Sequence, residues 1–369
     1  MGCPEDYPLL ELMTGGVKKA KPLPPPTGPG NLEVALGEAR PLILNFGAGV
    51  DSTCMSLKLL EEGIVPDLFI FADTGGEKPE TIWWKDEFAE HMASQGWPDL
   101  VTVKYEPVVL AYKTLLENCV VNKTLPSLAF GRGGCSIKWK HDAMDRFIMG
   151  GGRGARKVQP WSGWVQAREA GVKPTKLIGY DNGPKDSRRK INTSECDHFF
   201  YRYPLRENWQ LDRDGCMEVI RHHDLVVPPK SSCFFCPAMQ VVEVQWLYEH
   251  HPDLFLMALW CEAIALPGLK NCEGLWRKTR KRDGRSGSWL RWAEAEQLVE
   301  SDWRSVTQRF RPWNADDEIR TYDEISAIKF TGIAERQLED RGHTAANAEL
   351  EAELFIQRCE QIRALRPCA

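Results

Sequence analysis

The chain has no long apolar run. No stretch of its 369 residues approaches the roughly 20 consecutive apolar residues that cross a bilayer. We also expect no secretory signal peptide. Charged residues make up 27% of the sequence and hydrophobic residues 43%, a balance typical of soluble globular proteins. We therefore expect a cytoplasmic protein with no membrane partner.

The sequence also lacks an excess of positive charge and any visible internal repeat. Its net charge of −5 argues against a generally basic nucleic-acid-binding protein. Basic residues are concentrated locally, however, in Trp276–Trp292, where seven Lys or Arg alternate with three tryptophans. Such interleaving suits phosphate contacts combined with base stacking, and it equally suits an ordinary amphipathic hairpin. A nucleic-acid partner therefore stays open.

Cysteine, in contrast, is abundant, and twelve cysteines without a secretory signal favour metal or redox chemistry over disulfides. Cys233 and Cys236 form a C-x-x-C, whose spacing lets two thiolates reach one metal centre. Cys135 lies in a glycine-rich loop, where Lys138 and Lys140 would lower the pKa of its thiol. We expect ordinary packing for seven other cysteines, namely Cys3, Cys54, Cys119, Cys196, Cys261, Cys359 and Cys368.

The most informative segment is 42–73, where an apolar run ends in a glycine-rich turn. Leu42–Leu44 is typical of a short buried strand, and apolar residues recur at helical spacing after the turn. Gly47 and Gly49 let the backbone pass close to a ligand. The free N–H groups that open the following helix then favour an anion, most often phosphate. With a second strand at Leu68–Ala72, this order begins a doubly wound sheet that binds ligands at the carboxyl ends of its strands.

Two further apolar segments, Leu100–Tyr105 and Thr175–Tyr180, extend the expected sheet. The second opens onto a basic stretch in which Arg188 and Arg189 offer bidentate forks to a phosphate or sulfate. A solvated surface loop is an equal interpretation of that stretch. We predict an α/β protein with a doubly wound, mostly parallel sheet and a cysteine-rich, mainly helical C-terminal part.

Composition and pattern divide the chain into four expected segments. A Pro-rich stretch near the N-terminus favours a flexible lead rather than a domain. The C-terminal stretch has helical periodicity with mixed charge. The predicted boundaries are a lead at 1–38, a nucleotide-binding α/β domain at 39–210, a cysteine and metal-binding helical region at 211–300, and a helical tail at 301–369.

The glycine turn is not a Walker loop, because no Gly-Lys-Ser/Thr follows at the required spacing, and it does not fit G-x-G-x-x-G. It resembles the PP-loop of the adenine-nucleotide α-hydrolase superfamily, whose S-G-G-x-D-S pattern reads GAGVDS at Gly47–Ser52. Asp73–Thr81 (DTGGEKPET) is similar to the D-T-G-x-x-x-P-E-T segment of the branch that contains the phosphoadenylyl-sulfate (PAPS) reductases. The departure is Gly47, which removes the hydroxyl that a serine would offer to a phosphate.

The resemblance implies that ATP or an adenylyl sulfate nucleotide binds at the turn, with Mg²⁺. Asp51 and Ser52 would then be the catalytic residues. The nucleotide-binding residues that it implies are Gly47, Ala48, Gly49, Asp51, Ser52, Thr53, Asp73, Thr74, Gly75, Lys138, Arg188 and Arg189.

The cysteines carry the resemblance further. Adenylyl-sulfate reductases and several phage PAPS-reductase-like proteins hold a [4Fe-4S] cluster on a cysteine loop and a later C-x-x-C. Cys135, Cys233 and Cys236 match these positions, although a glycine stands where the reductase loop has a second cysteine. Cys216 is the first choice for a fourth ligand and Cys272 the second. Zinc on four thiolates is the alternative metal.

Three functions are compatible with these patterns. The resemblance favours an ATP pyrophosphatase that adenylates a substrate, releases pyrophosphate and supports sulfur transfer, with a nucleic acid or sulfur-carrier protein as partner. An adenylyl-sulfate or PAPS reductase is the second, but the attacking E-C-G-(I/L)-H cysteine of that family has no counterpart, since Cys368 lies in an RPCA sequence. A nucleotide-binding regulatory protein without catalysis is the third.

Overall fold

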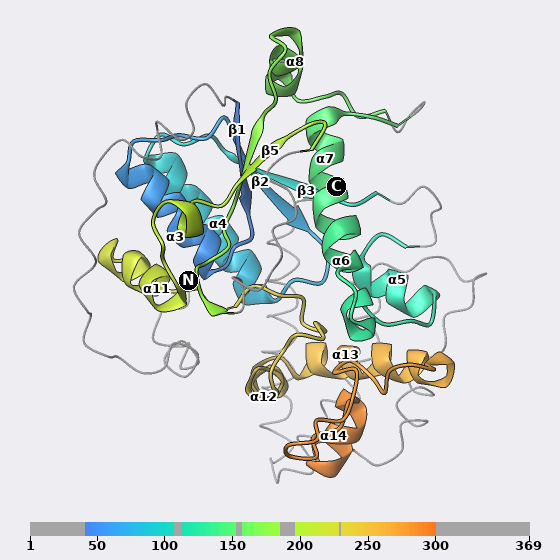
Figure 1. Ribbon diagram of the computed structural model, residues 1–369. Coiled ribbons are helices and arrows are strands. Elements are labelled where there is room, and N and C mark those ends of the chain that lie inside the picture. The colour runs from blue at the N-terminus through green and yellow to red at the C-terminus, as the bar shows by residue number, and fades with distance from the viewer. Residues whose placement is uncertain (1–40, 107–111, 153–156, 185–195, 229, 300–369) are drawn as a thin grey trace, which may run out of the picture. The chain divides into compact units, whose positions relative to one another are not determined.

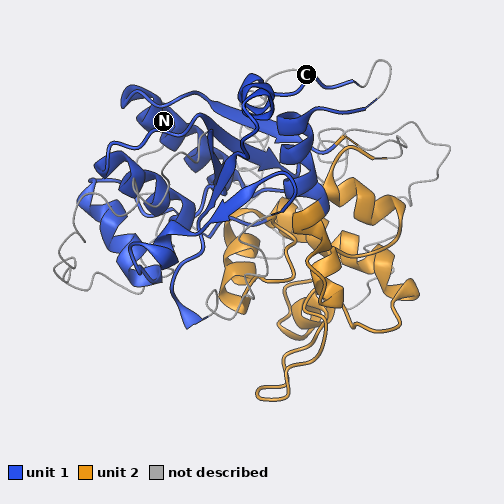
Figure 2. Cartoon of the chain, turned by 45° about the horizontal axis from the view of Figure 1, so that its top comes forward, with its two compact units in different colours: residues 1–105, 138–232 blue, residues 106–137, 233–369 orange. Residues whose placement is uncertain are grey.

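The computed structural model describes residues 41–106, 112–152, 157–184, 196–228 and 230–299, so the expected lead and tail lie outside these ranges. The chain divides into two compact units (Figure 2). Unit 1 comprises Met1–Tyr105 and Lys138–Ser232, and unit 2 comprises Glu106–Ile137 and Cys233–Ala369. Unit 1 therefore runs beyond the boundary expected near residue 210, and the internal segment Glu106–Ile137 belongs to unit 2.

Unit 1 is built on a five-stranded sheet with the order β3-β2-β1-β4-β5, in which every pair is parallel. Its strands are β1 (Leu42–Phe46), β2 (Leu68–Asp73), β3 (Leu100–Lys104), β4 (Thr175–Ile178) and β5 (Phe200–Arg202). The α/β class with a parallel sheet is therefore confirmed, as are the four strands expected from apolar runs. Strand β5 was not expected, because three residues are too few to produce a periodic signal.

Helices cover both faces of this sheet (Figure 1). On one face, α3 (Val50–Glu61), α4 (Pro79–Ser94) and α11 (Arg213–His222) pack around the Phe46 and Phe69 rings. On the other face, α7 (Asp142–Met149) and α8 (Ser162–Glu169) cover Ile43 and Ile70. This two-sided cover explains the unbroken apolar runs of β1 and β2. The short helices η3 (Ile137–His141) and α10 (Pro204–Glu207) complete this part of the chain.

The strand order creates a switch point between β1 and β4. From β1 the chain adds β2 and then β3 on one side, and it later returns to place β4 on the other side of β1. The connection that follows β1 therefore leads to one side of the sheet, and the connection that follows β4 leads to the other side. In open parallel sheets, ligands bind in the crevice at such a point.

Unit 2 is helical in its described parts. Its elements are α5 (Leu115–Val121), η2 (Ser127–Phe130), α6 (Gly134–Ser136), α12 (Val241–His250), α13 (Pro252–Ala265), η5 (Leu266–Gly268) and α14 (Trp289–Ala295). Helix α13 is buried around almost its whole circumference and forms the centre of this unit, in contact with α5, α12 and α14. Within the residues described, no helix is long and apolar enough to cross a membrane.

Candidate functional site

The glycine turn lies at the switch point, between the end of β1 and the start of α3. Gly49 is the residue before the first turn of α3, and Ala48 has a φ of 50°, in the left-handed region. A residue with a Cβ in that conformation costs about 1–2 kcal/mol relative to a right-handed one. Backbone strain of this kind concentrates at functional sites. The resembled motif has glycine at the Ala48 position, so the geometry of the turn agrees with that motif.

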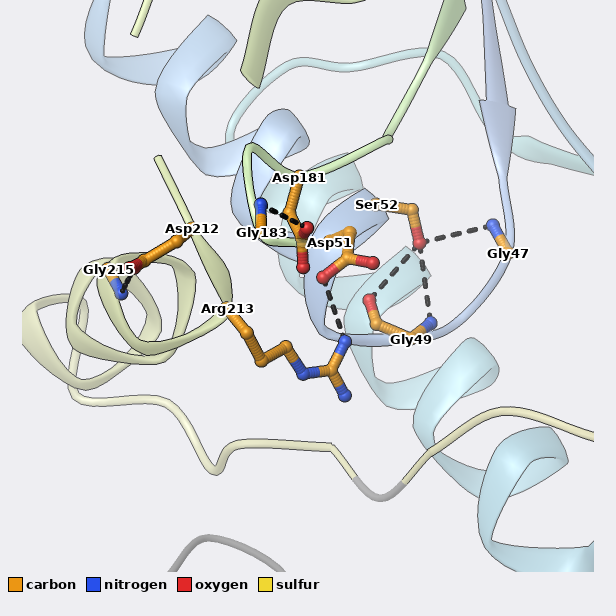
Figure 3. A network of polar contacts seen from close by, with 9 residues as sticks. All are labelled: Gly47, Gly49, Asp51, Ser52, Asp181, Gly183, Asp212, Arg213 and Gly215. Atoms are coloured by element: carbon orange, nitrogen blue, oxygen red, sulfur yellow. Dashed lines mark hydrogen bonds and ion pairs between the residues drawn. The ribbon is translucent and has the colours of Figure 1, made fainter. Parts of the chain in front are cut away.

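The Ser52 side chain closes this turn on itself (Figure 3). Its Oγ accepts hydrogen bonds from the amides of Gly47 and Gly49 at 3.1 and 3.3 Å, and it donates to the Gly49 carbonyl at 3.1 Å. Ser52 therefore fixes the shape of the loop. The Gly47 and Gly49 amides are thus occupied by Ser52, whereas the N–H groups that open α3 are the ones from which we expect anion binding.

Asp51 is held by an arginine that sequence reasoning missed. Its Oδ1 accepts from Nη1 of Arg213 at 2.8 Å, and the two side chains are 22% and 42% exposed (Figure 3). Arg213 is the first residue of α11 and follows the N-cap Asp212. The Asp212 carboxylate accepts a hydrogen bond from the Gly215 amide. A cation in the first turn opposes the helix dipole, and the Asp51 carboxylate offsets that effect here.

The loop after β4 packs directly on the first turn of α3. A Cβ at Gly179 would lie 3.0 Å from the Ser52 amide nitrogen and 3.1 Å from the Asp51 carbonyl carbon. Any other residue at this position would require the backbone of α3 to shift by a few tenths of an ångström. Two residues later, the buried Asp181 accepts from the Gly183 amide at 2.8 Å, which fixes the course of this loop (Figure 3). The carboxyl end of β4 thus forms part of the same site as the glycine turn.

A second missed contribution comes from the end of unit 1. A Cβ at Gly49 would lie 2.7 Å from Oγ of Ser231, so that serine covers the glycine turn. The neighbouring Ser232 carbonyl accepts from the amide of Lys78, the N-cap of α4, at 3.3 Å. Segment 231–232 therefore joins the glycine turn to the start of α4.

The loop after β2 is shaped by its own side chains. Asp73 accepts from the Gly75 amide at 2.7 Å, and the Thr74 hydroxyl donates to Glu77 at 3.1 Å. Glu77 also forms an ion pair of 3.1 Å with Lys140, and its carboxylate side chain is only 1% exposed. Asp73, Thr74 and Gly75 thus lie at the carboxyl edge, as expected, and Glu77 adds a buried carboxylate that sequence reasoning missed.

The remaining predicted nucleotide residues differ in their surroundings. Thr53 is fully buried, and its hydroxyl accepts from the indole of Trp84 at 3.0 Å, so this side chain belongs to the core. The ammonium of Lys138 lies 5.0 Å from the centre of the Tyr105 ring, a cation–π distance. Arg188 and Arg189 fall outside the described residues.

The predicted metal ligands Cys135, Cys233 and Cys236 all belong to unit 2, are half-buried and form no disulfide. Cys233 and Cys236 share one turn, closed by a 3.1 Å hydrogen bond from the Cys236 amide to the Cys233 carbonyl. Cys272, the second choice for a fourth ligand, lies buried in the same unit. Within the described ranges, no three His, Cys, Asp or Glu side chains are grouped closely enough to hold a metal ion.

Cys216, the first choice for a fourth ligand, belongs to unit 1 instead. It is fully buried on the side of α11 that packs against α3. A hydrogen bond to Cys54, together with burial, raises the pKa of the Cys216 thiol well above its usual value. Both effects favour the protonated thiol over the thiolate that a metal requires.

The tryptophans of the basic segment are not available to stack on bases. Trp276, Trp289 and Trp292 are at most 7% exposed, and the ring of Trp276 lies 5.4 Å from each of the other two. They form a packed aromatic cluster in unit 2. The base-stacking interpretation of this segment is therefore wrong, although its basic residues remain to be explained.

Comparison with known proteins gives little further information. No protein-family model matches this chain, and no curated protein matches it. Among solved structures it is similar to phosphoadenylyl-sulfate (PAPS) reductase from Candida auris in a phosphate complex. The two are 16% identical, with 62% of this chain and 90% of that chain covered and a TM-score of 0.34. The function must therefore be argued from the geometry of the site itself.

Proposed function

We propose that unit 1 binds the phosphates of an adenine nucleotide at the switch point between β1 and β4. The observation that carries the proposal is the contact between the two strand ends. Gly179, after β4, packs on the first turn of α3, which the glycine turn after β1 introduces. A glycine turn opening a twelve-residue helix at a switch point supplies a positive dipole end and a close backbone approach.

Arg213 and Asp51 would exchange partners when the nucleotide binds. Their ion pair is partly exposed, and such pairs contribute only about 0–1 kcal/mol to stability. A phosphate offers the guanidinium a stronger, bidentate partner, and Mg²⁺ is a hard cation that prefers carboxylate oxygen. We therefore assign Arg213 to phosphate oxygens and Asp51 to Mg²⁺ in the loaded enzyme.

The chemistry that fits this site is adenylation in support of sulfur transfer. An oxygen of the substrate attacks the α-phosphorus, the bond from that phosphorus to the bridging oxygen breaks, and pyrophosphate leaves. A sulfur nucleophile then displaces AMP from the activated carbon. The Arg213 guanidinium would stabilise the charge that develops on the phosphoryl oxygens. Ser52 would act indirectly, by holding the glycine turn in shape.

The iron–sulfur site is a separate part of the proposal, and the fit of the residues to it is partial. The turn at Cys233 and Cys236 presents two thiols that form no disulfide, and Cys135 and Cys272 are further thiols of the same unit outside any disulfide. We prefer Cys272 to Cys216 as the fourth ligand because Cys272 belongs to the same unit as the other three, although burial raises the pKa of its thiol as well. A cluster held there would supply a site for sulfur. The anaerobically purified protein should contain about four irons and four sulfides per chain. One zinc and no iron would instead indicate a structural zinc site at the turn of Cys233 and Cys236.

The enzymatic proposal is tested by incubating the anaerobically purified protein with Mg-ATP and candidate thiol or sulfide acceptors. We expect AMP and pyrophosphate in equal amounts, and Arg213→Ala should slow their release. Release of sulfite from PAPS and a reductant, with no pyrophosphate from ATP, would instead establish the reductase. Binding of nucleotide without turnover under all conditions would favour the regulatory protein.

A further inference from the structure

The basic residues between Trp276 and Trp289 form a feature that the proposed function does not use. We call Arg277–Arg285 the basic turn. It contains six Lys or Arg and one acidic residue, whereas the whole chain has a net charge of −5. The cations are Arg277, Lys278, Arg280, Lys281, Arg282 and Arg285. This positive charge is therefore a local concentration against an acidic background.

The chain on both sides of the basic turn is anchored on one buried carboxylate. Glu262 of α13 is fully buried, and its side chain accepts from the amides of Leu275, Trp289 and Leu290 at 2.5, 3.0 and 2.7 Å. The Ser288 hydroxyl donates to the same carboxylate at 2.8 Å. The segments that enter and leave the turn are thereby held side by side on the centre of unit 2.

A second carboxylate holds the turn closer to its tip. Glu273 accepts from the amides of Thr279 and Gly287 at 3.0 and 3.3 Å. A Cβ at Gly287 would lie 2.6 Å from the backbone of Lys278, so the two arms of the turn touch there. The Arg280 amide then donates to the Arg285 carbonyl at 2.8 Å and closes the tip. These contacts make the basic turn a defined projection rather than a loose loop.

Four of its cations are exposed. Two of the six cations have partners among the residues that the structure describes. Arg280 forms an ion pair with Asp283, and the guanidinium carbon of Arg285 lies 4.2 Å from the centre of the Trp276 ring. The other four are solvent-exposed, namely Arg277, Lys278, Lys281 and Arg282. The aromatic residues and the two anchoring carboxylates thus fix the turn, and the exposed cations form its outer surface.

We propose that the basic turn binds the phosphate backbone of a nucleic acid without reading its bases. Sequence 277–287 (RKTRKRDGRSG) has no apolar side chain, so it offers neither a hydrophobic interface core to a protein nor an insertion into lipid. Arginine predominates among its cations, and the guanidinium fork matches phosphate bidentately. Because the tryptophans are buried, the contact is electrostatic and independent of base sequence. This surface belongs to unit 2, whereas the proposed nucleotide site belongs to unit 1.

The test uses the full-length protein and two fluorescein-labelled probes, a 20-mer single strand and a 20-bp duplex, followed by anisotropy from 50 to 200 mM NaCl. The variant is K278Q/K281Q/R282Q. Its matched control is K123Q/K157Q/R168Q, which removes three exposed cations from other parts of the described chain. Both triples change the net charge equally, and both should unfold at the wild-type temperature, since every substituted side chain is exposed.

Each phosphate neutralised contributes about −0.9 to the slope of log K against log[salt] on duplex and about −0.7 on a single strand. Loss of three contacts should therefore flatten the slope by about 2.7 on duplex and about 2.1 on single strand. A slope difference of 2.7 equals about 40-fold in affinity over this salt range. The control variant should keep the wild-type slope. The probe that binds more tightly shows whether the basic turn prefers single-stranded or duplex nucleic acid.

Three results would overturn the proposal. The wild-type protein could bind neither probe at 50 mM NaCl. Both triples could lose the same slope, which would make net charge rather than the basic turn responsible. Finally, polyglutamate could compete as effectively as unlabelled duplex of equal total charge, which would assign the turn to an acidic protein.

Discussion

Gly179 offers the sharpest test of how the site is built. Replacing it by alanine places a Cβ 3.0 Å from the Ser52 amide nitrogen and 3.1 Å from the Ser52 Cα, closer than ordinary van der Waals contact. The atoms it meets are helix backbone, and Thr53 and Cys54 behind them are fully buried, so the first turn of α3 cannot shift alone. Overpacking of this kind costs about 1–3 kcal/mol of stability.

The same shift should weaken nucleotide binding. A first turn displaced by a few tenths of an ångström misdirects the amides that face the phosphates, and each 1.4 kcal/mol lost is about tenfold in affinity. We therefore expect Gly179→Ala to lower the urea midpoint and to weaken Mg-ATP binding by about tenfold in titration calorimetry. Gly133→Ala is the control, because its Cβ would meet nothing within 4 Å. If Gly179→Ala and Gly133→Ala had the same urea midpoint and the same Mg-ATP affinity, the packing argument would be refuted. If Gly179→Ala lost stability but kept its Mg-ATP affinity, the first turn of α3 would not contribute to binding.

Other substitutions test separate parts of the account. Gly47→Ser should fold, because the nearest atom to a Cβ there is Ser52 Oγ at 3.7 Å. It should strengthen Mg-ATP binding by about tenfold or more in calorimetry, because a hydrogen bond to phosphate is worth about 1.5–3 kcal/mol. Weaker binding would contradict the motif alignment. Arg213→Ala should weaken Mg-ATP binding by tenfold or more while changing the free energy of unfolding by less than about 1 kcal/mol. Burial raises the pKa of Glu262 above its ordinary value of 4.5, so the folded state binds its proton more tightly than the unfolded state, and stability should fall as pH rises from 4.5 toward the folded pKa. In Glu262→Gln, the free energy of unfolding measured in urea should lack this part of its dependence on pH. Cys233→Ser should lose most of any bound iron by elemental analysis, and full retention would exclude the proposed ligands.

The fold could be predicted because its central strands β1, β2 and β4 are buried on both faces. Unbroken apolar runs such as Leu68–Ala72 identify strands that helices cover on each side, and the order of strand and helix then indicates a parallel sheet. The two compact units could not be predicted. Residues 106–137 join unit 2 through tertiary packing of α5 on α13, and no local change of composition marks that crossing.

The candidate site was predicted where it is local in sequence and missed where it is not. The glycine turn and the loop at Asp73 each follow a recognisable strand, so their motifs could be located. Arg213 reaches Asp51 across 162 residues, and no local feature of the sequence indicates that contact. Ser231 was missed for the same reason. The spacing of Cys216 suggested a ligand, whereas its burial against Cys54 depends on how α11 packs on α3.

The central claim is that a nucleotide binds through Asp51 and the glycine turn of unit 1. Titration calorimetry of Mg-ATP into the wild-type protein and Asp51→Ala tests it most directly, with thermal unfolding of both as the check on folding. The account predicts one saturable site in the wild type, and binding that is lost in the variant while the unfolding temperature stays unchanged. Equal affinity in the two proteins, or no binding to the wild type, would contradict it.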